Sequence, residues 1–214
     1  MRINFFVGIL MLLGLSSCFT IMKSLATPDN IITDDRITGQ WISSDSKSLV
    51  VQKFMDSKYK SVFDEADHHG YSQTDSIFWT KLYIISYREN NLNYSWLAGI
   101  VKIKNQFYIN LGPGECLTDQ HKNAYDIGKT LETSSLAKFD WKNGNELEIQ
   151  FLDGDRIKEI ILNGNARISH EYDPLFNTFV ITASSSELTE FLEKYGNSEM
   201  LYKGGNHIDL VRKR

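Results

Sequence analysis

A series of short hydrophobic segments, separated by turn residues, limits this chain to a fold made mainly of β-strands. The clearest pair of segments spans residues 139–141 and 147–151, and Asn143-Gly144 lies between them. Asn-Gly between two such segments is the strongest short-range signal for a tight β-hairpin. The pair therefore predicts two antiparallel strands joined by a short turn.

Three more segments predict an antiparallel meander upstream of this hairpin. Residues 77–87 are rich in aromatic and β-branched side chains, which strands prefer, and residues 94–104 and 107–111 follow after turns at 90–91 and 105–106. Both faces of the first segment are apolar, whereas a strand with one face in water alternates polar and apolar side chains. This strand is therefore covered by the core on both sides, or one of its sides lines a cavity.

The remaining segments predict further strands and two helices, which together indicate the fold class. Residues 49–54 predict a strand that returns over 58–63, and residues 208–212 predict a last strand that closes the chain on itself. Two segments have helical spacing instead: one near 155–163, capped by Asp155, and one near 186–195. We expect a mostly β, β-rich α+β fold, with an antiparallel meander or barrel-like sheet and these two helices.

The N-terminus has the pattern of a secretory signal. Arg2 is followed by an apolar run over residues 3–15, which is shorter than the ~20 residues that a membrane-spanning helix needs. Leu15-Ser16-Ser17-Cys18 then resembles the lipobox of bacterial lipoproteins. The resemblance implies cleavage after Ser17 and a lipid on Cys18, and the alternative is an ordinary signal with a chance cysteine.

This interpretation divides the chain into three parts. Residues 1–17 are the signal peptide, residues 18–36 are the lipidated cysteine and a flexible tether, and residues 37–214 are a single β-rich domain. Phe19, not an aspartate, follows the cysteine, and in lipoproteins of enteric bacteria this goes with transfer to the outer membrane. We therefore expect a lipid-anchored protein of the bacterial cell envelope, on the outer membrane and facing the periplasm.

Charge and cysteine content narrow the function classes. The chain carries a net charge of −4, which gives no support to nucleic-acid binding, since that needs a concentrated basic patch. Of its two cysteines, Cys18 is used by the anchor, so Cys116 has no intrachain partner. Cys116 is a buried small residue, a nucleophile with His121 as its base, or an intermolecular bridge; the buried role is favoured because free cysteine is among the most buried residue types.

A second resemblance concerns the globular part. Gly39-Gln40-Trp41 is similar to the Gly-x-Trp motif that opens the first strand of lipocalin-like barrels, where the tryptophan packs across the barrel base under a basic residue of the last strand. Arg212 is placed for that role. Together with the meander, the hairpin and the C-terminal helix, the motif resembles uncharacterised lipocalin-like envelope lipoproteins over most of 37–214. This resemblance implies a β-rich barrel and no particular activity.

Two sets of residues are candidates for a site. Hard carboxylates and imidazoles can bind a divalent metal, and Asp67 and His68 are the weak candidates for such ligands in a segment with the composition of a surface loop. Asp153-Gly154-Asp155 is explained by a turn and a helix cap and not by calcium binding. The candidates for lining a ligand cavity are the aromatic residues Trp79, Tyr83, Trp96 and Phe107.

Three functions remain open. The first is a binding module that holds a small apolar ligand or a partner protein of the envelope, and it is the one we favour. The second is a structural or assembly lipoprotein without a ligand, which would present an exposed apolar patch. The third is a metal-dependent hydrolase acting through Asp67 and His68. No cofactor is expected, and the membrane is a partner through the lipid on Cys18.

Overall fold

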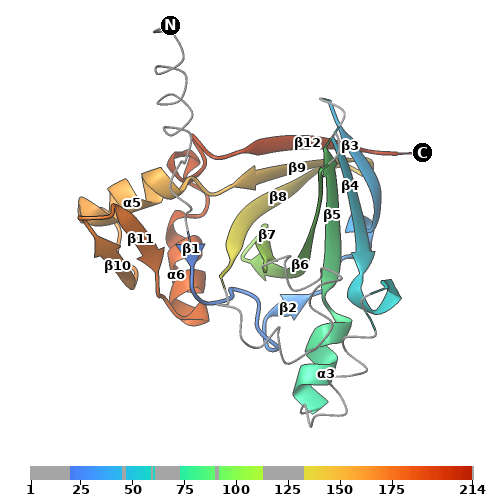
Figure 1. Cartoon of the computed structure of the whole chain (residues 1–214), viewed down its shortest axis with the longest axis horizontal. Coiled ribbons are helices and arrows are strands. Elements are labelled where there is room, and N and C mark those ends of the chain that lie inside the picture. The colour runs from blue at the N-terminus through green and yellow to red at the C-terminus, as the bar shows by residue number, and fades with distance from the viewer. Residues whose placement is uncertain are drawn as a thin grey trace, which may run out of the picture.

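Antiparallel hairpins join edge to edge into a β-barrel (Figure 1). The computed structural model describes residues 20–44, 47–58, 60, 73–89, 92–112 and 133–213. Within this part of the chain, hydrogen bonds link neighbouring strands in the order β6-β5-β4-β3-β12-β9-β8-β7, and β7 pairs with β6 to close the ring. The eight strands are β3 (Gly39–Ser43), β4 (Ser48–Lys53), β5 (Tyr83–Glu89), β6 (Leu92–Ile103), β7 (Gln106–Leu111), β8 (Ser135–Asn143), β9 (Glu146–Phe151) and β12 (His207–Arg212). The mostly β fold class is confirmed.

Local turn chemistry sets the register of these hairpins. In the β8–β9 hairpin Asn143 pairs with Glu146, so Gly144 and Asn145 form the two-residue turn. In the β6–β7 hairpin Ile103 pairs with Gln106, and Lys104 takes a positive φ of 54°. Both turns lie where the sequence predicted them, within one residue.

The last strand closes the barrel by pairing on both of its edges. Arg212 of β12 lies opposite Trp41 of β3, and Leu210 lies opposite Leu147 of β9. Because successive side chains of a strand point to opposite faces, Leu210 faces the interior and Val211 faces solvent, with 3% and 53% of their surfaces exposed. The predicted closing strand is confirmed.

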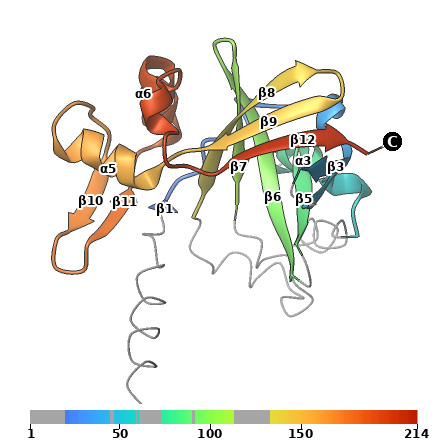
Figure 2. The same ribbon diagram turned by 90° about the horizontal axis from the view of Figure 1, so that it is seen from above.

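A helical and β insertion between β9 and β12 covers the outside of one barrel wall (Figure 2). Asp153 accepts a hydrogen bond from the Arg156 backbone and caps α5, so the cap is Asp153 and not the predicted Asp155. Ser184 and Glu187 form a reciprocal capping box on α6. The elements are α5 (Gly154–Leu162), β10 (His170–Asp173), β11 (Thr178–Ile181), α6 (Ser185–Tyr195) and the 3-10 helix η4 (Glu199–Leu201). Both predicted helices are confirmed.

The described residues form two hydrophobic cores, one on each side of the barrel wall. Strand β5 shows the division, since Tyr83 and Ile85 belong to the interior core whereas Leu82, just before the strand, and Ile84 belong to the outer core. The outer core also contains buried side chains of α5 and α6, such as Ile157 and Leu188. Both faces of β5 are thus apolar because each face of the barrel wall is covered by a hydrophobic core.

The first part of the predicted strand over 77–87 is a helix. Residues Gln73–Thr80 form α3, and β5 begins only at Tyr83. The aromatic ring of Trp79 packs on Phe54 in the short 3-10 helix η2 (Phe54–Asp56), with 5.1 Å between ring centroids. This tertiary contact outweighs the strand preference of the local sequence.

The prediction of a flexible tether over 18–36 is wrong for residues 20–36. Strand β1 (Thr20–Ile21) pairs with β11, strand β2 (Ile31–Ile32) pairs with β6, and η1 (Asp35–Ile37) leads into β3. Ile21 and Leu25 are fully buried, and the Leu25 backbone donates a 2.7 Å hydrogen bond to Asn110 Oδ1. Residues 20–36 are therefore part of the folded body, which does not begin at residue 37.

The barrel wall is adapted to this N-terminal segment. A Cβ at Gly99 of β6 would lie 2.7 Å from the Cβ of Ala26, so a side chain there would collide with the segment that crosses the outer face. The predicted signal peptide over 1–17, Cys18, and the segment 113–132 lie outside the described residues. So does almost all of the predicted return strand over 58–63.

Candidate functional site

One end of the barrel, which we call the closed end, is sealed around Trp41. The indole is fully buried, and its Nε1 donates a 2.8 Å hydrogen bond to the Ile37 carbonyl. The Arg212 guanidinium lies over the indole, with its central carbon 4.3 Å from the ring centroid, and donates to the Thr38 and Arg36 carbonyls. The stack of a basic residue of the last strand on this tryptophan, which the Gly-x-Trp resemblance implies, is present.

Gly39 is required beside this stack. Its φ is +129°, a backbone conformation that residues with a side chain rarely adopt. A Cβ at this position would also lie 2.7 Å from Arg212 Nη1 and would displace the guanidinium. The spacing Gly39-x-Trp41 therefore leaves room for the arginine and places the indole one strand repeat further along, on the same face.

Aromatic rings complete the closed end. Trp141 lies 5.9 Å from Trp41 and 6.3 Å from Phe139, and Phe139 stacks on Phe107 at 5.2 Å, all measured between ring centroids. The Tyr83 hydroxyl accepts a 2.8 Å hydrogen bond from the Asp34 backbone, and burial raises the pKa of this phenol. Rings in direct contact fill this end of the barrel.

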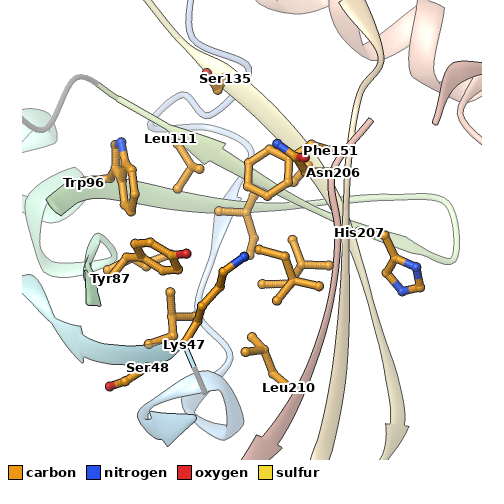
Figure 3. A pocket seen from close by; sticks show the side chains of 16 residues that line it. Lys47, Ser48, Tyr87, Trp96, Leu111, Ser135, Phe151, Asn206, His207 and Leu210 are labelled. Atoms are coloured by element: carbon orange, nitrogen blue, oxygen red, sulfur yellow. The ribbon is translucent and has the colours of Figure 1, made fainter. Parts of the chain in front are cut away.

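The other end, which we call the open end, contains a cavity of about 520 Å³ (Figure 3). The side chains that line it come from seven of the eight strands, and most of them are apolar. They include Leu49, Ile85, Tyr87, Trp96, Ile109, Leu111, Ala137, Ile149, Phe151, Ile208 and Leu210. The barrel interior is thus a cavity at one end and a solid aromatic core at the other.

A few polar groups lie at the rim of this cavity. Ser48 and Ser135 begin strands β4 and β8, and Asn206 precedes β12. Lys47 lies between β3 and β4, and Figure 3 shows its side chain extending among the apolar residues of the cavity. His207 also borders the cavity, but its imidazole points away from it, as the start of β12 requires when Ile208 faces inward.

The four aromatic residues predicted to line a cavity lie in three different places. Trp96 lines the cavity. Tyr83 and Phe107 are inside the barrel but belong to its closed end. Trp79 is on α3 and packs in the outer core, so it lies outside the barrel and cannot touch a ligand in the cavity.

Sequence reasoning missed the aliphatic majority of the lining. Ile208 and Leu210 alternate with the polar residues His207 and Asp209 along β12, which is the period of a strand with one buried face. That alternation identifies inward positions, but it does not separate a ligand cavity from a solid core. The cavity depends on how the side chains of seven strands fill the interior together, and Ala137 fills the least among the apolar ones.

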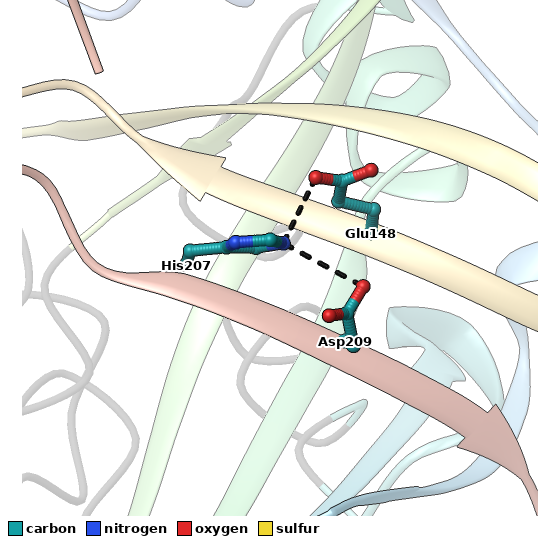
Figure 4. A group of neighbouring side chains, drawn as sticks. All are labelled: Glu148, His207 and Asp209. Carbon is teal, nitrogen blue, oxygen red and sulfur yellow. Dashed lines mark ion pairs between the residues drawn. The ribbon is translucent and has the colours of Figure 1, made fainter. Parts of the chain in front are cut away.

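Three chemistry-bearing side chains meet on the outside of the barrel (Figure 4). His207 Nε2 lies 2.8 Å from Glu148 Oε1 and 3.5 Å from Asp209 Oδ1. The Lys142 ammonium lies 2.7 Å from Asp209 Oδ1 and 3.3 Å from Glu148 Oε2. Hydrogen bonding from Lys142 lowers the pKa of Asp209. Lys142 thus forms an ion pair with both carboxylates. These ion pairs on the protein surface explain why the three side chains lie together, and no metal is needed.

Other predicted site residues fall outside the described part of the chain. These are the lipidation and cleavage positions Cys18 and Ser17, the metal candidates Asp67 and His68, and the pair Cys116 and His121. Residues 113–132, which contain the last pair, connect β7 to β8, and the strand ends Leu111 and Ser135 on either side of them both border the cavity.

The chain was compared with protein-family models, curated proteins and solved structures. No protein-family model, no curated protein and no solved structure matches the chain. Within the part of the chain that the structure describes, none of the helices is long and apolar enough to cross a membrane.

Proposed function

We propose that the protein is a lipid-anchored binding protein of the bacterial cell envelope whose barrel holds a small apolar ligand. The observation that carries this proposal is the cavity of about 520 Å³ at the open end. Pockets that hold small molecules measure about 300–1,000 Å³ and are lined mainly by apolar and aromatic side chains with a few polar groups. The cavity has both properties.

The distribution of polar groups suggests how such a ligand would lie. Apolar side chains such as Ile109 and Leu210 surround most of the interior, and the polar groups are Lys47, which extends among them, and Ser48, Ser135 and Asn206 near the strand ends. Burying a polar ligand group without a hydrogen bond is costly. An apolar body would therefore occupy the interior, and any polar group of the ligand would lie where it can pair with Lys47 or with the serines and Asn206.

The envelope location rests on the N-terminal sequence. Leu15-Ser16-Ser17-Cys18 at the end of the apolar run supports removal of residues 1–17 and acylation of Cys18. Two or three acyl chains hold a protein on a membrane far more firmly than one does. With Phe19 after the cysteine, we favour the periplasmic face of the outer membrane.

Filling the cavity tests the binding function. Leu111 lies on the cavity wall, and Leu111→Trp would place an indole in the space that the ligand needs. The probe is N-phenyl-1-naphthylamine, a neutral aromatic amine whose fluorescence rises in apolar surroundings. We expect the wild-type chain to bind it and Leu111→Trp to weaken binding by about tenfold or more, about 1.4 kcal/mol, because the indole takes up space that the probe needs.

The matched control is Leu162→Trp, the same change at a position on α5 where 44% of the side chain is exposed. It should bind the probe like the wild type, and thermal unfolding checks that both variants are folded. Native mass spectrometry of the protein purified from cells then looks for a co-purified ligand. Equal probe binding by both variants, with no co-purified ligand, would leave the structural role as the better account.

A further inference from the structure

The turn between β10 and β11 exposes two large apolar side chains. Leu175 is 82% exposed and Phe176 is 75% exposed, the highest values among the large hydrophobic residues that the structure describes. They are adjacent, and the exposed Tyr172 of β10 reaches the same turn, where its hydroxyl lies 3.5 Å from Asn177 Oδ1. Isolated exposed apolar residues are common, but two such residues at the tip of a hairpin form a candidate contact surface.

Hydrogen bonds hold the backbone of this turn. Asp173 Oδ1 accepts hydrogen bonds from the backbone of Leu175 at 2.8 Å and of Phe176 at 3.3 Å. Asn177 takes a φ of 54°, and its side chain accepts a hydrogen bond from Lys158 of α5. The tip is therefore attached to the body of the protein and presents Leu175 and Phe176 to its surroundings.

The direction of the N-terminal strand relates this turn to the proposed anchor. Strand β1 runs parallel to β11, with Thr20 opposite Val180 and Ile21 opposite Ile181. Because the turn precedes β11, following β1 backward from Thr20 leads toward the turn. Cys18 is two residues before Thr20 and lies at most about 7 Å from it.

The short distance leaves no room for a spacer. Phe176 is in the turn, four residues before Val180 of β11, so the two residues lie at most about 13 Å apart along the chain. The first buried residue of the body, Ile21, is only three residues after Cys18. A lipid on Cys18 would therefore hold the small sheet of β1, β11 and β10 against the membrane surface, with the turn at the same end of that sheet.

We propose that the β10–β11 turn is a membrane-contact surface, and that Leu175 and Phe176 insert into the bilayer on which the Cys18 anchor holds the protein. The proposal rests on the anchor of the proposed function. Apolar side chains at such a surface bind in the boundary between lipid headgroups and acyl chains. Tyr172, with Lys158 over its ring at 4.6 Å, supplies the aromatic and cationic groups that are frequent at headgroup level.

A depth measurement on the full lipidated chain tests this proposal. Phe176→Cys is made in a Cys116→Ala background, labelled with the environment-sensitive dye NBD, and reconstituted into vesicles of phosphatidylethanolamine and phosphatidylglycerol. Half of the vesicles contain a lipid with a nitroxide on its acyl chain, which quenches only dyes that reach that depth. We expect blue-shifted emission and loss of most of it in the nitroxide vesicles.

The control is Ile77→Cys in the same background, at a position on α3 that is 52% exposed and lies at the other side of the molecule (Figure 1). Its dye should emit as in water and should not be quenched. Flotation of the vesicles separates the two proposals: protein that stays with the lipid while position 176 remains unquenched overturns the contact surface alone, and protein that does not float overturns the anchor. Blue-shifted emission without quenching would assign the turn to a second copy of the chain and would also overturn the proposal.

Discussion

The closed and open ends of the barrel are built from the same strands but are filled differently. Along β8 the inward residues are Ala137, Phe139 and Trp141, and along β7 they are Leu111, Ile109 and Phe107, so on both strands the larger side chains lie toward the closed end. There the rings touch one another. From this difference we propose that stability and ligand binding are separated along the barrel axis: contacts between rings fill the closed end, and the open end keeps a cavity.

The strongest way to break this comparison is to remove the central ring of the closed end. Trp41→Ala deletes a fully buried indole together with its ring contact to Trp141 and its stack under Arg212. Large-to-small changes of buried aromatic residues cost about 3–5 kcal/mol. We expect a loss of that size in the free energy of unfolding, measured by urea denaturation followed by circular dichroism.

Trp96→Ala is the matched change at the open end. The Trp96 ring is half-buried, borders the cavity and lies 6.2 Å from the Tyr87 ring between centroids, so its removal enlarges an existing cavity and uncovers Tyr87 but no ring of the closed end. A loss of about 1 kcal/mol is expected. Equal losses for the two tryptophans would show that the two ends contribute alike to stability.

At the glycine beside the stack we expect an effect smaller than that of Trp41→Ala. Gly39→Ala places a side chain at a φ of +129° and moves Arg212 away from its position over Trp41. Strained backbone of this kind costs about 1–3 kcal/mol. Urea denaturation should show a loss in this range for Gly39→Ala.

Gly144→Ala provides the control, because a Cβ at Gly144 meets no atom within 4 Å. It should leave the free energy of unfolding nearly unchanged. In an Arg212→Met background, Gly39→Ala should still cost most of its effect, since the backbone strain remains. A cost that vanished there would assign the requirement for glycine to the guanidinium alone.

The elements that the sequence predicted correctly are those with local signals. The Asn143-Gly144 hairpin carries its own turn chemistry, and the α6 helix carries the capping box of Ser184 and Glu187. The motif Gly39-x-Trp41 with Arg212 was predicted through resemblance, and the stack is present. The turn and the capping box each depend on a few residues that are close in sequence, and Gly39-x-Trp41 with Arg212 is a recurring motif.

The elements that the sequence did not predict depend on distant partners. Strands β1 and β2 have two residues each, too few to show a period, and their segment is held by contacts such as Leu25 with Asn110, 85 positions away. Helix α3 has the composition of a strand and owes its place to the packing of Trp79 on Phe54. The cavity itself depends on how much of the interior the side chains of many strands leave empty, which no single segment reveals.

The smallest expected effect is the pH-dependent stabilisation by Asp34, in the loop that covers the closed end. Hydrogen bonding from Arg36 holds the pKa of Asp34 below its ordinary value of 3.8. Asp34 also accepts a hydrogen bond from the Arg36 backbone at the start of η1. Because the folded state binds the proton less readily than the unfolded state, the stabilisation is fully present above the ordinary pKa and is lost as the pH falls through the lower folded value.

Asp34→Asn therefore lowers the free energy of unfolding at neutral pH by up to about 1 kcal/mol, the value typical of pairs with an exposed partner. Below pH ~3 the difference from the wild type should shrink, because the wild-type carboxyl is then protonated as well. Probe binding at the open end should not change at neutral pH.

Asp209→Asn, on the exposed outer face of β12, is the control and should have the smaller effect on unfolding. If Asp34→Asn weakened probe binding while the barrel stayed folded, the closed end would influence the cavity, and the separation of stability from binding would fail.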